Sequence, residues 1–308
     1  MTRPTVAILM ATYNGARYLP VQLESLTAQT YPHWKLFVSD DGSTDGTREI
    51  LQHHQTIWAS GRLHLFTGPR QGVAANFLSL LARPEIDADY YAFCDQDDRW
   101  LPGKLARALA WLDTVPPTKP ALYMSRTYLV DAEERPIALS PFYRHPPSFA
   151  NALVQNIAAG NTIFFNHAAC SLLRETLPKT SVPFHDWWTY LILAGSGANM
   201  YFDPTPTLFY RQHQHNTLGT NATLAAKKRR FKLLLQGEYR RWIDANLTAL
   251  EPHKKRLLPP NVQVLECFFR ARTSFVLFRP FHLLRANIRR QNFMGTLAIH
   301  LAALANQL

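Results

Sequence analysis

Short apolar runs alternate with segments of helical period between residues 5 and 94, and this alternation constrains the fold more than any other feature. The runs are VAILMA (6–11), KLFVS (35–39), RLHLF (62–66) and YYAFC (90–94). Between the first two runs, Leu19, Leu23 and Leu26 recur at helical spacing. Strands separated by helices in this way are typical of stacked βα units. The sequence therefore predicts an α/β domain on a Rossmann-like, mostly parallel sheet.

The helices of the first half have recognisable limits. Ser43 and Thr44 are candidate caps for the helix that carries TREILQHH. A third helix should follow Gly72, and a fourth should span residues 105–112 before a cluster of prolines. The second half has a mixed α+β pattern. We expect strands at 121–125, 161–165 and 207–211, and helices at 149–157 and 186–193.

Positive charge gathers at the end of the chain. The net charge is +11, yet residues 220–308 hold 16 Lys and Arg against 4 Asp and Glu, and residues 1–219 hold 17 against 18. We predict a boundary near Thr220, with two halves before it (1–115 and 116–219) and a helical, basic extension after it (220–308). A basic tail on a near-neutral body suggests attraction to a polyanion, either anionic lipid or nucleic acid.

Cysteine usage and hydropathy limit the compartment. The three cysteines are far apart and lack metal-ligand spacing, which favours a reducing compartment over a disulfide framework or a zinc site. The first residues superficially resemble a signal peptide, but the apolar run passes directly into a periodic segment, so we interpret it as a strand. No apolar stretch reaches the roughly 18 to 20 residues that span a bilayer. We expect a cytoplasmic protein.

Two polar motifs follow the first two strands. ATYNG (11–15) offers the ring of Tyr13 for stacking on a base, and SDDGSTDGT (39–47) offers carboxylates for a base or a ribose. Open α/β sheets bind ligands at the carboxyl ends of their strands. Each motif is also compatible with an ordinary turn or helix cap.

The motif CDQDD (94–98) follows the fourth strand. Three carboxylates within four residues repel one another at low dielectric, and such clusters are seldom kept without a cation. Oxygen ligands favour Mg²⁺ or Mn²⁺, which commonly bridge to substrate phosphates. A solvated acidic loop is the alternative.

Together, these three motifs, in this order and at these spacings, resemble the family 2 glycosyltransferases with the GT-A fold, over about residues 5–215. The resemblance implies metal ligands among Asp95, Asp97, Asp98 and His213, the last from YRQHQHN (210–216). It implies a nucleotide-sugar pocket built from residues of the three motifs and of PRQGVAANF (69–77). These residues are Ala11, Thr12, Tyr13, Asn14, Asp40, Asp41, Arg70, Gly72, Asn76, Asp95 and Gln96.

The second half supplies a candidate catalytic base. The family places an acidic residue at the start of a helix, and PFHDWW (183–188) supplies Asp186 there, with His185 where the family more often has Glu. Trp187 and Trp188 would form an apolar wall on the acceptor side that raises the proton affinity of this carboxylate. Alternatively, Asp186 caps a helix and both tryptophans are core. The acceptor side would also include Gly160 and Asn161, from GNTIFFN (160–166).

The combination of DQDD with Trp100, GNT and HDWW most resembles bacterial rhamnosyltransferases of O-antigen and capsule assembly. This resemblance implies an inverting transfer from dTDP-L-rhamnose, or from another dTDP- or UDP-sugar, to a growing cell-surface polysaccharide or a lipid-linked acceptor. In residues 231–247 and 268–290, aromatic and leucine side chains alternate with arginines, as in helices that lie on an anionic membrane. We expect peripheral attachment to the inner face of the plasma membrane. A solvated helical cap or an oligomer interface is the alternative.

Three other classes are less consistent with the residues. A sugar nucleotidyltransferase should carry a Gly-rich, Arg- or Lys-containing phosphate loop after its first strand, and ATYNGARY is not one. A nucleic-acid-binding protein should show a helix-turn-helix or RNP signature beside its basic tail. A catalytically silent sugar-nucleotide-binding protein would have no need of both the acidic triplet and Asp186.

Overall fold

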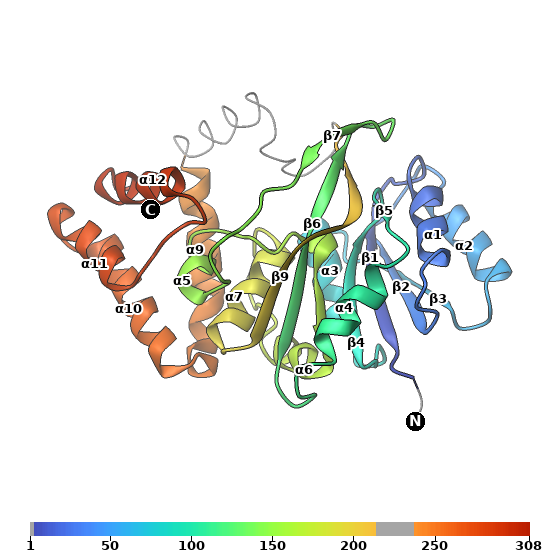
Figure 1. The fold of residues 1–308 in the computed structure, drawn as a ribbon, viewed down its shortest axis with the longest axis horizontal. Helices are drawn as coiled ribbons and strands as arrows, with labels where there is room; N and C mark the ends of the chain where they lie inside the picture. The colour runs from blue at the N-terminus through green and yellow to red at the C-terminus, as the bar shows by residue number, and fades with distance from the viewer. Residues whose placement is uncertain (1–2, 214–236) are drawn as a thin grey trace.

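The computed structural model describes residues 3–213 and 237–308. Within them, nine strands form one sheet of order β3-β2-β1-β4-β8-β6-β9-β5, and β7 pairs with β6 (Figure 1). The strands are β1 (Val6–Thr12), β2 (Trp34–Asp40), β3 (Leu63–Thr67), β4 (Tyr90–Asp95), β5 (Arg99–Trp100), β6 (Ala121–Val130), β7 (Pro136–Leu139), β8 (Phe164–Asn166) and β9 (Asn199–Arg211).

The first four strands are parallel, and β1, β2 and β4 are buried on both faces over most of their length, whereas β3 is only partly buried. Strand β1 pairs with β2 and β4, and β2 pairs with β3, all in parallel. Alternate side chains of β1 enter two separate hydrophobic clusters, Val6 and Ile8 on one face and Ala7 and Leu9 on the other. A parallel strand covered on both faces has a continuous apolar run instead of an alternating one. This is why VAILMA is uninterrupted.

The second half adds strands of mixed direction. Strand β8 runs antiparallel to both β4 and β6, and β6 and β9 run parallel to each other. The short strand β5 pairs antiparallel with Leu208 and Phe209 of β9. The end of β9 therefore lies beside the acidic motif that joins β4 to β5.

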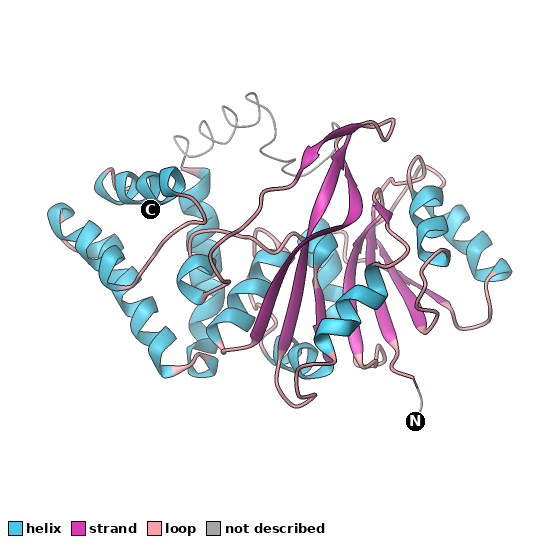
Figure 2. Ribbon diagram, viewed as in Figure 1, coloured by secondary structure: helices cyan, strands magenta, loops and turns pink. Residues whose placement is uncertain are grey.

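Helices cover both faces of the sheet (Figure 2). One face is packed by α1, α2 and α4, and the other by α3, α6 and α7. The helices up to β9 are α1 (Leu19–Thr27), α2 (Thr47–Ile57), α3 (Val73–Leu81), α4 (Lys104–Leu112), α5 (Phe149–Ala152), η1 (Gly160–Thr162), α6 (His167–Glu175) and α7 (His185–Gly195). The α/β prediction with a mostly parallel sheet is confirmed.

The first four predicted strands agree with the structure to within one or two residues at each end. The short strand β5 was not expected. The second half was predicted less well, because α5 ends at Ala152, residues 160–162 form a 3-10 turn, and helix α6 and strand β7 were not expected. The prediction that Ser43 or Thr44 caps helix α2 is wrong. Helix α2 begins at Thr47 after the left-handed Gly46, and Ser43 instead donates a hydrogen bond to Asp40.

The C-terminal helices pack on the α5 and α7 side of the molecule. They are α9 (Glu238–Leu250), η2 (Glu251–Arg256), α10 (Pro259–Thr273), η3 (Val276–Phe278), α11 (Arg279–Arg285) and α12 (Phe293–Leu304). Side chains such as Ile243 and Phe268 share one hydrophobic cluster with Trp188 of α7. The predicted boundary near Thr220 lies outside the described residues. Among the described helices, none is both long and apolar enough to cross a membrane.

Candidate active site

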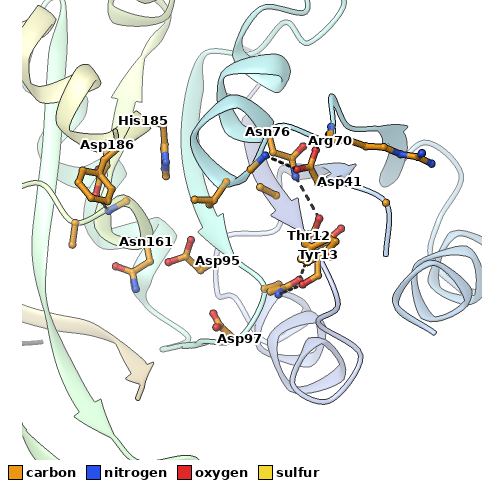
Figure 3. Close-up of a pocket in the computed structure, with 18 of the residues that line it drawn as sticks. Thr12, Tyr13, Asp41, Arg70, Asn76, Asp95, Asp97, Asn161, His185 and Asp186 are labelled. Atoms are coloured by element: carbon orange, nitrogen blue, oxygen red, sulfur yellow. Dashed lines mark hydrogen bonds between the residues drawn. The ribbon is translucent and has the colours of Figure 1, made fainter. Parts of the chain in front are cut away.

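A cavity of about 790 Å³ opens at the carboxyl ends of β1, β2 and β4 (Figure 3). Its lining contains most of the predicted site residues, brought together from segments far apart in the sequence. Those residues are Ala11, Thr12, Tyr13, Asp41, Arg70, Gly72, Asn76, Asp95, Gln96, Asp97, Gly160, Asn161 and Asp186. The lining also includes several residues that the sequence did not predict as site residues, namely Gly42, Thr44, Val73, Ala159, Phe184, His185 and Tyr210.

Asp41 shapes one wall of the cavity. Its two carboxylate oxygens accept hydrogen bonds from the backbone N–H groups of Arg70 at 2.6 Å and Gly72 at 2.9 Å. Both of these residues have positive φ, 58° and 87°, so the carboxylate holds a loop that the backbone would not otherwise favour. Next to them, Asn76 donates to the carbonyl of Ser39 at 2.8 Å, while its own buried Oδ1 has no partner in the described part of the chain.

The side chain of Gln96 holds the backbone of Tyr13 through two hydrogen bonds. Gln96 Oε1 accepts from the Tyr13 N–H and its Nε2 donates to the Tyr13 carbonyl, both at 3.0 Å. The ring of Tyr13 itself is 59% exposed. The pair of hydrogen bonds fixes the backbone while the ring stays available to a flat partner. A Cβ at Gly15 would lie 2.2 Å from Gln96 Oε1, so this glycine is required for the contact.

Asp40 and Asn14 do not line the cavity, contrary to their predicted place among the nucleotide-sugar residues. Asp40 is fully buried and accepts from the hydroxyls of Thr12 at 2.9 Å and Ser43 at 2.6 Å. Burial alone would raise the pKa of Asp40, but hydrogen bonds from Ser43 and Thr12 outweigh it and the pKa is lowered. Asn14 accepts from the Thr44 N–H at 2.9 Å. Both side chains brace the loops that do line the cavity.

The three aspartates of the acidic motif have different surroundings. Asp95 and Asp97 face the cavity, whereas Asp98 is completely buried and accepts from Asn161 Nδ2 at 2.6 Å. The predicted ligand role of Asp98 is therefore not supported, because Asp98 does not line the cavity and its two oxygens accept from Asn161 Nδ2 and the Arg211 N–H. Burial, together with the charges of Asp97 and Asp186, raises the pKa of Asp95 well above its usual range. Added positive charge would be stabilised here.

His213, one of the predicted metal ligands, contacts the acidic motif. Its Nε2 is 2.7 Å from Asp97 Oδ2, and its ring stacks on Tyr18 with the centroids 5.1 Å apart. Among the described residues, however, no three His, Cys, Asp or Glu side chains converge as a ready-made metal site. The acidic motif thus offers two cavity-facing carboxylates, those of Asp95 and Asp97, and a cation held by them would need further oxygen ligands from a substrate.

Asp186 stands on the opposite wall, in the first turn of α7. Its oxygens accept from the N–H groups of Gly160 at 3.0 Å and Trp187 at 2.7 Å. Burial raises its pKa to about 6, although hydrogen bonds from Trp187, Asn156 and Gly160 oppose the rise. It does not cap the helix, since Phe184 is the N-cap residue.

The apolar wall beside Asp186 is not made of tryptophans. Trp187 is 3% and Trp188 0% exposed, and neither lines the cavity. Trp187 Nε1 instead donates to the Ala152 carbonyl at 2.6 Å. The prediction that they form the acceptor side is wrong, because the helix turns both rings into the core.

Phe184 and His185, instead of the two tryptophans, line the cavity beside Asp186. The His185 ring stacks on Phe77 with the centroids 3.9 Å apart, and burial lowers its pKa to about 3, so the imidazole is neutral. Its Nε2 is buried and has no partner in the described part of the chain.

Lys104 is another residue near the site that was not predicted from the sequence. It is 1% exposed at the start of α4, and its Nζ donates to the Asn161 carbonyl at 2.7 Å, directly behind the cavity. Burial lowers its pKa to about 7, against the charges of Cys94, Asp98 and Asp95. The available signal was its spacing, since Lys104, Ala108 and Leu112 share the buried face of the helix.

The parallel sheet, the cavity at its carboxyl edge and the carboxylates on two facing walls define a protein of the GT-A glycosyltransferase class. The sequence model of glycosyl transferase family 2 matches residues 7–178, more than half of the chain. The chain belongs to this family.

Known proteins of similar sequence or structure agree. The dTDP-rhamnosyl transferase RfbG of Shigella flexneri is 28% identical over 250 residues, 78% of this chain and 84% of that protein. The UDP-Glc:alpha-D-GlcNAc-diphosphoundecaprenol beta-1,3-glucosyltransferase WfaP of Escherichia coli is 23% identical, over 68% of this chain and 77% of that protein. The structure of S. aureus TarS 1-349 with UDP-GlcNAc superposes with a TM-score of 0.58 at 15% identity, over 98% of this chain and 88% of that one.

Proposed function

We propose that this glycosyltransferase moves a sugar from a nucleoside-diphosphate donor to a hydroxyl group of a carbohydrate acceptor, in one displacement that inverts the anomeric carbon. The observation that carries the proposal is the position of Asp186. Its carboxylate lies on the wall opposite the nucleotide-side residues, close enough to Asp95 for its charge to raise the pKa of that group.

The donor would lie between the first two loops and the acidic motif. Tyr13 offers a ring for the base, and the loop held by Asp41 closes around it. Asp95 and Asp97 would hold Mg²⁺ or Mn²⁺, with the remaining ligands taken from the diphosphate. Two carboxylates per site are typical of magnesium, which keeps substrate phosphates and water as its other ligands. Such a cation, when bound, neutralises charge that grows on the departing diphosphate.

Asp186 would accept the proton of the attacking hydroxyl. Its pKa of about 6 keeps it ionised at neutral pH while bringing its basicity nearer to that of the working pH than an ordinary carboxylate. The Gly160 and Trp187 N–H groups fix both oxygens, so the carboxylate is oriented before the acceptor arrives. Attack from the side of Asp186, with departure on the side of Asp95 and Asp97, leads to inversion.

RfbG is a dTDP-rhamnosyl transferase by name, and for this reason we propose dTDP-L-rhamnose as the donor, with a UDP-sugar as the alternative. WfaP is named for a diphosphoundecaprenol-linked acceptor. A lipid-linked glycan at the inner face of the plasma membrane is accordingly the proposed acceptor. No observation favours a nucleotidyltransferase or a silent sugar-binding protein.

A donor panel tests this function. Hydrolysis and transfer are measured with dTDP-rhamnose, UDP-glucose, UDP-GlcNAc and GDP-mannose, before and after chelation and with Mn²⁺ restored. We expect turnover of one donor class, lost on chelation and recovered with Mn²⁺. Calorimetry that finds no binding of any nucleoside diphosphate, with or without the cation, would overturn the proposal.

A further inference from the structure

Exposed apolar side chains are concentrated at the C-terminal end of the described chain. Of nineteen large hydrophobic residues that are exposed in the described part, ten lie within residues 275–304. We call these ten the C-terminal apolar surface. They are Phe275, Leu277, Phe278, Phe281, Leu284, Phe293, Met294, Leu297, Leu301 and Leu304, with exposures between 40% and 77%.

These side chains are not left over from a poorly packed core. Helix α12 already buries Ile299, Ala302 and Ala303, and α11 buries Leu283. The exposed residues of α12 recur at positions 293, 297, 301 and 304, which is one stripe of a helix. Helix α12 is therefore apolar on two faces, and helices of this kind are found in protein cores or in lipid.

The charge around this surface has one sign. Residues 267–308 contain six arginines and no aspartate or glutamate. Arg272 and Arg279 are engaged, the first with Asp244 and the second with the carbonyls of Ser274 and Ala303. Arg270 and Arg285 are exposed and have no carboxylate partner in the described part of the chain. Their positive charge is available to an external anion.

We propose that the C-terminal apolar surface docks on an anionic lipid bilayer. Its aromatic and aliphatic side chains enter the boundary between headgroups and acyl chains, and Arg270 and Arg285 contact lipid phosphates. A face-to-face contact with a second copy would instead bring like-charged arginines together. The helices α11 and α12 that carry most of this surface lie at the opposite end of the molecule from α2 and β3 (Figure 1).

The proposed docking surface overlaps one of the two segments expected from the sequence. In α9, Tyr239, Ile243 and Leu247 are buried, so the described part of residues 231–247 presents no apolar face to a membrane. Residues 231–236 lie outside the described residues. The proposed docking surface lies on η3 and α11, within the expected residues 268–290, and on α12, which was not expected. The inference rests on the proposed function in one respect, that a lipid-linked acceptor gives the enzyme a reason to stay at the membrane.

Vesicle flotation with the full-length protein tests the inference. The vesicles are phosphatidylcholine alone or mixed with phosphatidylglycerol, and no nucleotide sugar is present. Two variants add charge to the surface, Leu277→Glu with Phe278→Glu, and Phe293→Glu with Met294→Glu. Ile57→Glu on α2, where the side chain is 59% exposed on the distant side of the sheet, is the matched control. A third variant, Arg270→Gln with Arg285→Gln, removes charge alone.

We expect the wild-type protein and Ile57→Glu to float with anionic vesicles, and each apolar double variant to bind at least about tenfold more weakly. Loss of each arginine should weaken binding about fivefold, and added salt should weaken it further. Equal flotation of the apolar variants would overturn the inference. So would sedimentation velocity that finds a wild-type dimer, abolished by these variants, without vesicle binding.

Two readouts separate this result from the proposed function. Thermal unfolding and nucleoside-diphosphate binding in solution are measured for every variant, and both should match the wild type. Vesicle binding without donor turnover would leave the membrane surface standing and remove the transferase proposal. Turnover of a soluble acceptor without vesicle binding would do the reverse.

Discussion

The backbone N–H of Gly160 donates a hydrogen bond to Oδ2 of Asp186 at 3.0 Å, which joins the turn Gly160–Thr162 to the start of α7. The next residue of the turn, Asn161, donates to Asp98 and accepts from Lys104. A single 3-10 turn thus connects the proposed base to the buried partners of the acidic motif. The two walls of the cavity are held in register by this turn.

Asp186→Asn should remove transfer while leaving the donor bound. The amide cannot accept the proton of the acceptor hydroxyl, so kcat should fall by about 10²- to 10⁴-fold. The Kd for the nucleoside diphosphate, measured by calorimetry, should stay within a few fold of the wild-type value. Asp87→Asn, at a side chain 75% exposed on the surface, is the control. Unchanged kcat in Asp186→Asn would exclude the role as base.

The same substitution should change how stability depends on pH. The folded-state pKa of Asp186, about 6, is above the usual carboxyl value, so the folded state holds this proton more tightly than the unfolded chain. Ionisation at neutral pH is therefore unfavourable to folding, and that cost declines as the pH falls from about 6 towards the usual carboxyl pKa. The amide does not titrate, although its NH2 group would face one of the two backbone N–H donors that contact Asp186. The free energy of unfolding of the wild type relative to the variant, measured in urea titrations, should therefore rise by roughly 1–3 kcal/mol as the pH falls from about 7 to about 4. A difference between the two proteins that does not change with pH would contradict the raised pKa.

The pH dependence of transfer should report the ionisation of Asp186. The base must be ionised, so kcat/KM should fall as the pH decreases through about 6 and level off above it. His185 should not contribute to this limb, because its pKa of about 3 leaves it neutral throughout. His185→Gln should therefore keep the position of the limb. A profile without any decrease near this pH would argue against Asp186 as the base.

Lys104→Met should lower stability and kcat together. The variant leaves the Asn161 carbonyl without its donor and removes the positive charge of Lys104, whose pKa burial lowers and the Asp98 carboxylate raises. Breaking one side of a buried charged network costs about 2–4 kcal/mol, which chemical unfolding can measure. The donor Kd should change less than kcat, because the turn holds Asp186 and not the nucleotide loops. Adding Asp98→Asn should recover part of the lost stability, and the absence of any recovery would mean that the two charges are not coupled.

Gly15→Ala should weaken nucleotide binding through Gln96. The added Cβ would lie 2.2 Å from Gln96 Oε1, so the two hydrogen bonds that hold the Tyr13 backbone cannot both persist. Each neutral hydrogen bond is worth about 1 kcal/mol, which corresponds to a roughly five- to thirtyfold increase in the nucleoside-diphosphate Kd for two of them. In a Gln96→Ala background, the additional effect of Gly15→Ala should be small. Additive effects in calorimetry would contradict this coupling.

The pattern of apolar runs in the sequence determined the strands of the first half of the molecule. Strands β1, β2 and β4 are buried on both faces over most of their length, and this burial favours apolar runs that can be read directly from the sequence. The polar motifs after those runs fall at the carboxyl edge of the sheet because parallel strands all end there. The convergence of Tyr13, Asp41 and Asp95 on one cavity was therefore predictable from order and spacing.

Long-range packing decided the rest. The same motifs contain residues that face the cavity and residues that brace it, and only pairing across the fold separates Asp97 from Asp98, or Asp41 from Asp40. Trp187 and Trp188 turn into the core because of how α7 rotates against its neighbours, which a helical pattern alone does not fix. Lys104 meets Asn161 across 57 residues of sequence. In the C-terminal helices, the sequence determined that apolar side chains and arginines alternate. Tertiary packing decided which apolar faces were buried, since α9 is covered by its neighbours whereas α11 and α12 have more apolar surface than their neighbours cover.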